Sequence, residues 1–136
     1  MQRLRTVLLR HARRGDTHLD WMFETPGPGA SRGALTTFRV ATPWSDWTRL
    51  GRIALAPLPP HRRAYLTRQG PVSGGRGFVT RVAAGTLDVL DWHDAGGVVV
   101  LRWPHEAAPV RLTLRTITPD HADLQATALG PVAATR

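Results

Sequence analysis

The sequence predicts a mostly β fold, a small antiparallel β-barrel of about eight short strands with little helix. Two observations support this prediction. Several windows of the 136-residue chain alternate apolar and polar residues, and few show a helical period. The 13 glycines and 11 prolines recur along the chain and divide it into short segments. Short strands at this spacing are typical of a small barrel or sandwich.

Three strands are expected in the N-terminal part of the chain. The first covers residues 4–11. The second covers residues 18–24, where apolar and polar side chains alternate between two faces. One face carries Leu19, Trp21 and Phe23, and the other carries His18, Asp20, Met22 and Glu24. A loop rich in Pro and Gly at residues 25–33 precedes the third strand at residues 34–40.

The next part of the chain is expected to be less regular. Residues 41–60 contain several prolines and are expected to lack regular structure, with Trp44 and Trp47 as anchors in the core. A short helical turn is expected at residues 61–66, and a glycine-rich loop at residues 70–77.

Hairpins are expected to fill the C-terminal part. A turn at residues 83–85 is expected to join paired strands at residues 78–82 and 86–92, and residues 94–97 favour a second hairpin turn. Further strands are expected at residues 98–103, 110–116 and 124–129. Residues 1–129 are thus expected to form one domain, and residues 130–136 a loose tail.

The charge balance indicates an anionic partner. The chain carries 18 basic residues, all of them arginine, against 10 acidic ones, for a formal net charge of +8. Because arginine binds phosphate through two parallel donors, nucleic acid is the first expected partner and an anionic membrane surface the second. An arginine-rich genome would produce the same composition without such a partner.

Composition also excludes several classes of protein. Without cysteine, the chain has no disulfide, no thiolate metal site and no cysteine nucleophile. No apolar run approaches the roughly 20 residues of a membrane helix. Arg10 interrupts the N-terminal apolar run, so a secretory signal is not expected. The expected location is the cytoplasm, with no membrane partner.

The first candidate site combines His11, His18 and Asp20. His18 and Asp20 are two residues apart on an expected strand, so they share a face. A hairpin loop between the two histidines would bring them opposite each other, and three ligands would meet. Two imidazoles and a carboxylate with open coordination positions suit manganese, iron or zinc. The alternative is two surface histidines and a solvated aspartate, because such spacing is common by chance.

Two further motifs could contact a phosphate. On one helical turn, His61 and Tyr65 would share a side and supply a general acid or a hydrogen bond to a phosphate oxygen. In the loop at residues 70–77, successive N–H groups could bind an anion, and Arg76 could clamp a phosphate. The alternatives are a polar loop with a half-buried tyrosine and an ordinary wide hairpin loop.

Taken together and in order, these motifs resemble the 3′-phosphoesterase domain of bacterial DNA ligase D. His11 followed by residues 18–24 is similar to the H…HxD signature of that family. Residues 58–65 and the glycine-rich loop at residues 70–77 resemble its second block, and residues 33–38 match the strand between the blocks. The resemblance covers most of the chain.

The resemblance implies a small β-barrel enzyme that uses a divalent metal, preferably Mn²⁺, with Zn²⁺ or another divalent ion as alternatives. The roles it implies are metal ligation by His11, His18 and Asp20, and contact with the scissile phosphate by His61 and Tyr65. An arginine before the histidine block of the family corresponds to Arg52, with Arg49 as the second choice. Arg52 and Arg76 would then neutralise the charge of the substrate.

The sequence departs from the family pattern at several positions. The family has an arginine two residues after the metal-binding aspartate, where this chain has Met22. The acidic residue before the glycine of the second block is Gln69 here, and the Trp-Asp pair before its Gly-Thr turn is Ala83 and Ala84. The spacing of the first two histidines is one residue longer than usual. Met22 removes a cation that would neutralise a phosphate, whereas the expected metal ligands are retained.

The predicted function is metal-dependent hydrolysis of a phosphoester at a DNA 3′ end, with removal of a 3′ phosphate or a 3′ ribonucleotide in DNA repair. The expected partners are DNA 3′ ends and a separate ligase or polymerase. One alternative is a non-catalytic nucleic-acid-binding module on the same barrel, which Met22 and Gln69 favour. Another is a phosphoesterase that acts on a small molecule.

Overall fold

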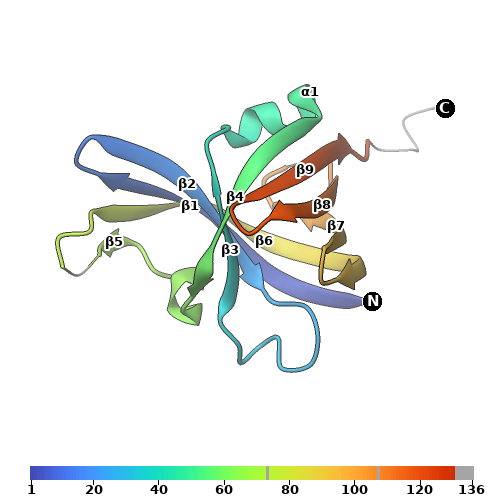
Figure 1. Ribbon diagram of the computed structural model, residues 1–136, viewed down its shortest axis with the longest axis horizontal. Helices are drawn as coiled ribbons and strands as arrows, with labels where there is room; N and C mark the ends of the chain where they lie inside the picture. The colour runs from blue at the N-terminus through green and yellow to red at the C-terminus, as the bar shows by residue number, and fades with distance from the viewer. Residues whose placement is uncertain (73, 107, 131–136) are drawn as a thin grey trace.

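Eight antiparallel strands of the computed structural model close into a barrel, and a ninth, short strand lies at its edge (Figure 1). The structure describes residues 1–72, 74–106 and 108–130. Around the barrel the strands follow the order β1–β2–β3–β4–β9–β8–β7–β6, and pairing of β6 with β1 closes the ring. The predicted fold class is therefore confirmed.

The strands and helices connect in a simple up-and-down pattern over most of the chain. The barrel strands are β1 (Gln2–Arg13), β2 (Asp16–Glu24), β3 (Leu35–Val40), β4 (Arg52–His61), β6 (Phe78–His93), β7 (Gly96–Arg102), β8 (Val110–Thr118) and β9 (His121–Ala128). The short β5 (Gly70–Pro71) pairs with the start of β6. The helical segments are η1 (Trp44–Asp46), α1 (Trp47–Leu50) and η2 (Arg63–Leu66).

Within the described part of the chain, no helix has both the length and the apolar composition needed to span a membrane. Of the tail predicted at residues 130–136, only Gly130 belongs to the described residues, and the rest lies outside them.

An apolar core fills the barrel interior. On β2, Trp21 and Phe23 share the inward face, as their alternation predicts, and their ring centroids lie 4.8 Å apart. Segment α1 adds Trp47, which is fully buried and lies 5.8 Å from the Trp21 ring. Trp44 packs partly buried against the same core, so both predicted tryptophan anchors are confirmed. This core holds β1 and β2 in the register that the candidate site requires.

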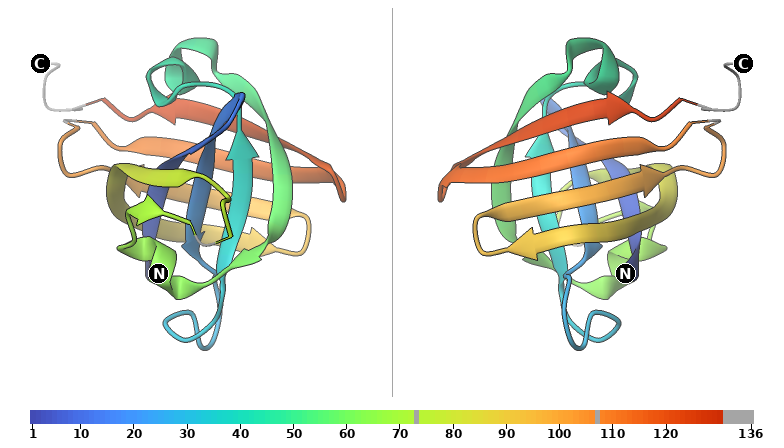
Figure 2. Two further views of the ribbon diagram at one scale, coloured as in Figure 1. Left: turned by 90° about the vertical axis from the view of Figure 1, so that its left-hand side faces the viewer. Right: turned by 90° about the vertical axis from the view of Figure 1, so that its right-hand side faces the viewer.

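A second, smaller core lies on the outer faces of β1, β2 and β3. Its buried residues are Val7, Leu9, Met22, Leu35 and Leu66. Leu66 comes from η2, which lies in front of these strands in the left view of Figure 2. Nη1 of Arg63 donates a hydrogen bond of 2.8 Å to Oε2 of Glu24 and thereby ties η2 to β2. The second core therefore fixes η2, and with it Tyr65, against the hairpin of β1 and β2.

Strand β4 corrects the expectation that residues 41–60 are irregular. Its first four residues pair with β9, and its later residues pair with β3 alone. All three prolines of the strand fall in the later part, where only one neighbouring strand needs hydrogen bonds. The strand continues to His61, so the helical turn expected from that residue begins only at Arg63.

Strand β6 corrects the expectation of a turn at residues 83–85. It continues without a break from Phe78 to His93, pairing first with β1 and then with β7. Gly85 permits close packing here, because a Cβ at this position would overlap the carbonyl oxygen of Arg102. The glycine that indicated a turn instead marks the close approach of two strands.

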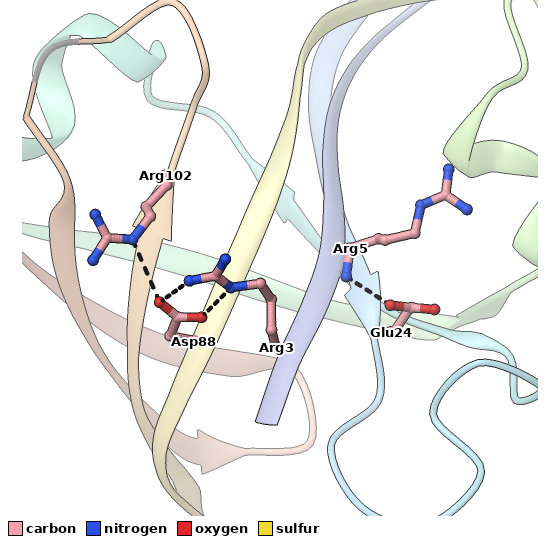
Figure 3. A network of polar contacts seen from close by, with 5 residues as sticks. All are labelled: Arg3, Arg5, Glu24, Asp88 and Arg102. Carbon is pink, nitrogen blue, oxygen red and sulfur yellow. Dashed lines mark hydrogen bonds and ion pairs between the residues drawn. The ribbon is translucent and has the colours of Figure 1, made fainter. Parts of the chain in front are cut away.

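An ion-pair cluster holds the seam where β1 meets β6 (Figure 3). Nε of Arg3 on β1 donates to Oδ1 of Asp88 on β6 at 2.7 Å. Nε of Arg102 on β7 donates to Oδ2 of the same carboxylate at 3.4 Å. The Asp88 side chain is buried, whereas both arginines are largely exposed. The cluster therefore links three adjacent strands across the closure of the barrel.

Candidate metal centre

The hairpin of β1 and β2 brings the three predicted metal ligands together. Its far end projects from the barrel on the same side as β5 (Figure 1). His11 lies directly opposite His18 in the hairpin register, as the sequence predicts, and Asp20 follows His18 on the same face. One ligand atom from each of these side chains lies within 4.8 Å of the other two. Two imidazoles and one carboxylate form a ligand set that leaves coordination positions open on a transition metal.

The ligand atoms converge without forming hydrogen bonds to one another. Nε2 of His18 lies 3.4 Å from Oδ1 of Asp20, and Nδ1 of His11 lies 3.8 Å from Oδ2 of the same carboxylate. Nε2 of His18 and Oδ1 of Asp20 are buried and have no hydrogen-bond partner among the described residues. Buried polar atoms without partners are costly. A cation between these atoms would satisfy both, so the residues present fit a divalent metal.

Each of the two histidines is oriented by a hydrogen bond through its other ring nitrogen. Nε2 of His11 donates to the main-chain carbonyl of Arg76 at 2.6 Å, because a carbonyl only accepts. Nδ1 of His18 donates in the same way to Oδ2 of Asp16 at 3.3 Å. In a neutral imidazole the remaining nitrogen then carries no proton. Nδ1 of His11 and Nε2 of His18 are therefore free to bind a metal, with their orientation fixed by the outer partners.

The contact between Arg76 and His11 depends on a close approach of the loop at residues 70–77 to β1. Gly77 has a φ of +94°, in the left-handed region that favours glycine. A Cβ at Gly77 would overlap the carbonyl oxygen of Ala12. The glycine therefore lets the loop pack on the hairpin and places a carbonyl acceptor beside His11, a predicted metal ligand.

Asp20 is a buried acid surrounded by bases. Burial raises the pKa of its carboxyl above the usual range, and the charges of His18, His61, His11 and Arg39 act in the opposite direction. Groups with a perturbed pKa and several specific charged neighbours are concentrated at functional sites. The electrostatics of Asp20 thus agree with a role as a metal ligand.

His61 and Tyr65, which the sequence predicts as the phosphate-contacting pair, lie together although they belong to β4 and η2. Their ring centroids are 5.5 Å apart in an edge-to-face arrangement. The pair helps to line an open hollow of about 470 Å³, which is lined by Pro59, Pro60, His61, Arg62, Tyr65 and Arg76. Arg76 also binds His11, and the charge of His61 reaches Asp20. The hollow therefore adjoins the predicted metal ligands.

Arg52 lies apart from the other predicted site residues. It begins β4, whereas His61 ends this strand nine residues later, at a distance of about 30 Å along a fully extended strand. Arg52 instead lines a hollow on the outer face of β4, β8 and β9. The second choice, Arg49, belongs to α1 and pairs with Asp46 at 3.2 Å. Neither arginine joins the hollow at His61 and Tyr65.

Two residues that the sequence reasoning did not assign lie at the site. Asp16 contacts Nδ1 of His18, and Arg39 lies opposite Asp20 in the register of β2 and β3. The position of Asp16, two residues before His18 on the same strand face, is a signal that the sequence contains. The position of Arg39 has no such signal, because its register depends on the path of the long loop between β2 and β3.

Comparisons with known proteins do not assign the chain to a family. No protein-family model matches the sequence, and no curated protein matches it. The resemblance to the 3′-phosphoesterase domain of ligase D therefore stays a prediction, and a functional assignment has to rest on the geometry of the metal ligands and the adjoining hollow.

Proposed function

We propose that this protein is a divalent-metal-dependent phosphoesterase that acts on the 3′ ends of nucleic acid, with Mn²⁺ as its preferred metal and DNA as its preferred substrate. One observation carries the proposal. Nε2 of His18 and Oδ1 of Asp20 are buried, lie 3.4 Å apart and have no hydrogen-bond partner among the described residues. Two buried polar atoms without hydrogen-bond partners lower the stability of the folded protein unless a cation binds between them.

The residues that would hold the metal are His11, His18 and Asp20. Nδ1 of His11, Nε2 of His18 and the Asp20 carboxylate supply a nitrogen and oxygen ligand set suited to manganese, iron or zinc. A divalent cation bound there would polarise a phosphoryl oxygen as a Lewis acid. The hydrogen bonds from His11 and His18 to their outer partners keep both rings in the tautomer that ligation requires.

His61 is suited to transfer a proton to the leaving oxygen. Its Nδ1 donates to the carbonyl of Pro59 at 2.9 Å, so this nitrogen keeps its proton and Nε2 is the nitrogen that gains and loses one. When the ring is protonated, Nε2 can act as a general acid. Tyr65 packs against the edge of this ring and offers a hydroxyl donor to a phosphate oxygen.

The charge of the chain favours nucleic acid as the carrier of the phosphate. The formal net charge of +8 attracts a polyanion. All 18 basic residues are arginines, which offer bidentate donors to its phosphates. Binding to a DNA end should therefore weaken steeply with salt, because counterions are released when the phosphates are contacted. A phosphoesterase for small molecules would not need this dependence.

A non-catalytic nucleic-acid-binding module is the second candidate, and the position of Met22 favours it. Met22 is 1% exposed within the second core, so no cation extends from this position toward a phosphate. A binding module would retain the salt dependence but would not need Mn²⁺. The two candidates therefore differ in their requirement for the metal.

An assay of 3′-end processing tests the proposed function. Labelled primer–templates ending in a 3′ phosphate or in a single ribonucleotide are incubated with the protein and Mn²⁺. We expect dephosphorylation or loss of the ribonucleotide with the wild type, and none with His18→Ala or with EDTA. His105→Ala, which removes an exposed histidine from a turn outside the site, is the matched control and should retain full activity. Salt-sensitive binding without turnover would favour the binding module.

A further inference from the structure

Arg39 lies on the same outer face of the sheet as the metal ligands. It is paired with Asp20 in the antiparallel register of β2 and β3. Residues directly opposite each other in such a pair project from the same face, with Cβ atoms about 4.5–5.5 Å apart. Its neighbours along β3, Phe38 and Val40, are buried in the barrel core, whereas Arg39 is exposed. The strand thus directs a long cationic side chain to the side where His18 and Asp20 gather.

The guanidinium of Arg39 has no partner among the residues that the structure describes. Within the described residues it donates no hydrogen bond and forms no ion pair, in contrast to Arg3, Arg49 and Arg63, which are each bound to a carboxylate. Its charge nevertheless acts on the Asp20 carboxyl. An arginine on a rigid strand, close to the Asp20 carboxylate and without a partner in the described parts of the chain, is available to an anion.

Two other arginines near the hairpin, Arg10 and Arg81, are placed differently. Arg10 is paired with Leu19, so it projects from the opposite face of the sheet. Arg81 donates its side chain to the carbonyl of Leu66 beside η2. On the outer face of β2, which carries His18 and Asp20, the next side chain is Met22. It is uncharged and packs under η2. Arg39 is therefore the arginine that the register brings closest to Asp20 along the paired strands.

We propose that Arg39 binds the phosphate group that a metal at His11, His18 and Asp20 would hold. This inference rests on the proposed function. A guanidinium offers two parallel N–H donors to two phosphate oxygens and neutralises part of the charge of the phosphate. Arg39 does not ligate the metal, so its contribution is to substrate binding and not to metal binding.

Binding of inorganic phosphate to the Mn²⁺-loaded protein tests this inference directly. Bound Mn²⁺ broadens the ³¹P resonance of phosphate that binds near it, and a titration gives the dissociation constant. We expect Arg39→Ala to weaken phosphate binding about tenfold or more, as loss of a charge-assisted pair of hydrogen bonds does. Arg39→Lys keeps the positive charge but lacks the two parallel N–H donors of the guanidinium, so it should retain only part of the phosphate affinity.

The same variants separate this role from a structural one. Arg10→Ala removes the same charge from the opposite face and should leave phosphate binding within about twofold of the wild type. Arg39→Ala should bind Mn²⁺ at least as tightly as the wild type, because a cation near the site is removed. An equal phosphate affinity in Arg39→Ala and the wild type would overturn the inference and leave the metal site intact. Failure of the wild type to bind Mn²⁺ would overturn the proposed function itself.

Discussion

The metal site depends on which nitrogen of each histidine carries the proton. For His18 that choice is made by Asp16, whose carboxylate accepts a hydrogen bond from Nδ1–H and leaves Nε2 without a proton. Outer partners of this kind change metal affinity by about 10–100-fold when they are removed. We therefore expect Asp16→Ala to weaken Mn²⁺ binding by such a factor in calorimetric titration, and Asp16→Asn to be intermediate because its amide oxygen still accepts.

Asp94→Ala is the matched control for this prediction, because Asp94 is an exposed acid in the turn between β6 and β7. Its loss changes the net charge equally and should leave Mn²⁺ binding unchanged. Equal Mn²⁺ affinity in Asp16→Ala and the wild type would show that Asp16 has no part in orienting His18.

The buried carboxylate of Asp20 should make the metal-free protein less stable than it would be without the charge. Burial raises the pKa of Asp20, so the folded state binds a proton more tightly than the unfolded chain. Stability conferred by this group therefore falls as the pH rises from the usual carboxyl range, near 4, to the raised pKa. We expect Asp20→Asn to be more stable than the wild type in urea at pH 7 with EDTA.

Added metal should reverse this order. A ligand at 100 times its dissociation constant stabilises the folded state by about 2.7 kcal/mol. Mn²⁺ should therefore raise the unfolding midpoint of the wild type and have little effect on Asp20→Asn. A wild type that is the more stable of the two in EDTA would contradict the account of Asp20.

Among the larger elements, the loop between β5 and β6 supports the site through its packing on β1. Gly77→Ala would force a Cβ into the carbonyl oxygen of Ala12 and would place alanine at a left-handed φ. We expect a loss of about 3 kcal/mol in urea denaturation, from backbone strain and overpacking together. Mn²⁺ affinity should also fall, because the Arg76 carbonyl moves away from His11.

Gly75→Ala isolates the contribution of packing. Gly75 has a similar φ of +67°, but a Cβ there would have no neighbour within 4 Å. The strain alone should cost about 1 kcal/mol, and Mn²⁺ affinity should stay near that of the wild type. Equal effects of the two substitutions would mean that the close approach of the loop to β1 has no role in the site.

The barrel seam between β1 and β6 should respond to acid. Hydrogen bonds from Arg3 lower the pKa of Asp88, burial opposes this shift, and Arg102 adds a smaller lowering. The stabilisation is therefore present above the usual carboxyl pKa, near 4, and is lost as the pH falls toward the lowered value. We expect Asp88→Asn to be about 1 kcal/mol less stable at pH 7, since both arginines are exposed to solvent.

Urea denaturation between pH 7 and pH 2.5 measures this difference. The advantage of the wild type over Asp88→Asn should shrink as the pH falls below about 4. A difference that stays constant over this range would show that Asp88 stabilises the seam by packing and not by its charge.

On the scale of the whole molecule, the sequence predicts the barrel and the core of the site because both depend on local patterns. Alternation in β2 defines an inward face with Trp21 and Phe23. The short connection between β1 and β2 allows only a hairpin, so the pairing of His11 with His18 follows from nearby residues. Features of this kind need no knowledge of distant parts of the chain.

The features that the sequence does not predict depend on contacts between distant segments. The prolines of β4 indicate irregular structure, but they are tolerated because the later part of this strand has one neighbour. Gly85 resembles a turn residue, but it makes room for the backbone at Arg102. The place of Arg39 opposite Asp20 and the separation of Arg52 from His61 are likewise set by strand pairing across the sheet.

The most direct test of the account is a titration of the protein with Mn²⁺ followed by electron paramagnetic resonance, which distinguishes free from bound ion. This titration asks whether His11, His18 and Asp20 hold a divalent cation. We expect one bound ion per chain in the wild type and in His105→Ala, and no binding in His18→Ala at the same concentrations. Equal Mn²⁺ binding by His18→Ala and the wild type, or no binding by the wild type, would contradict this expectation.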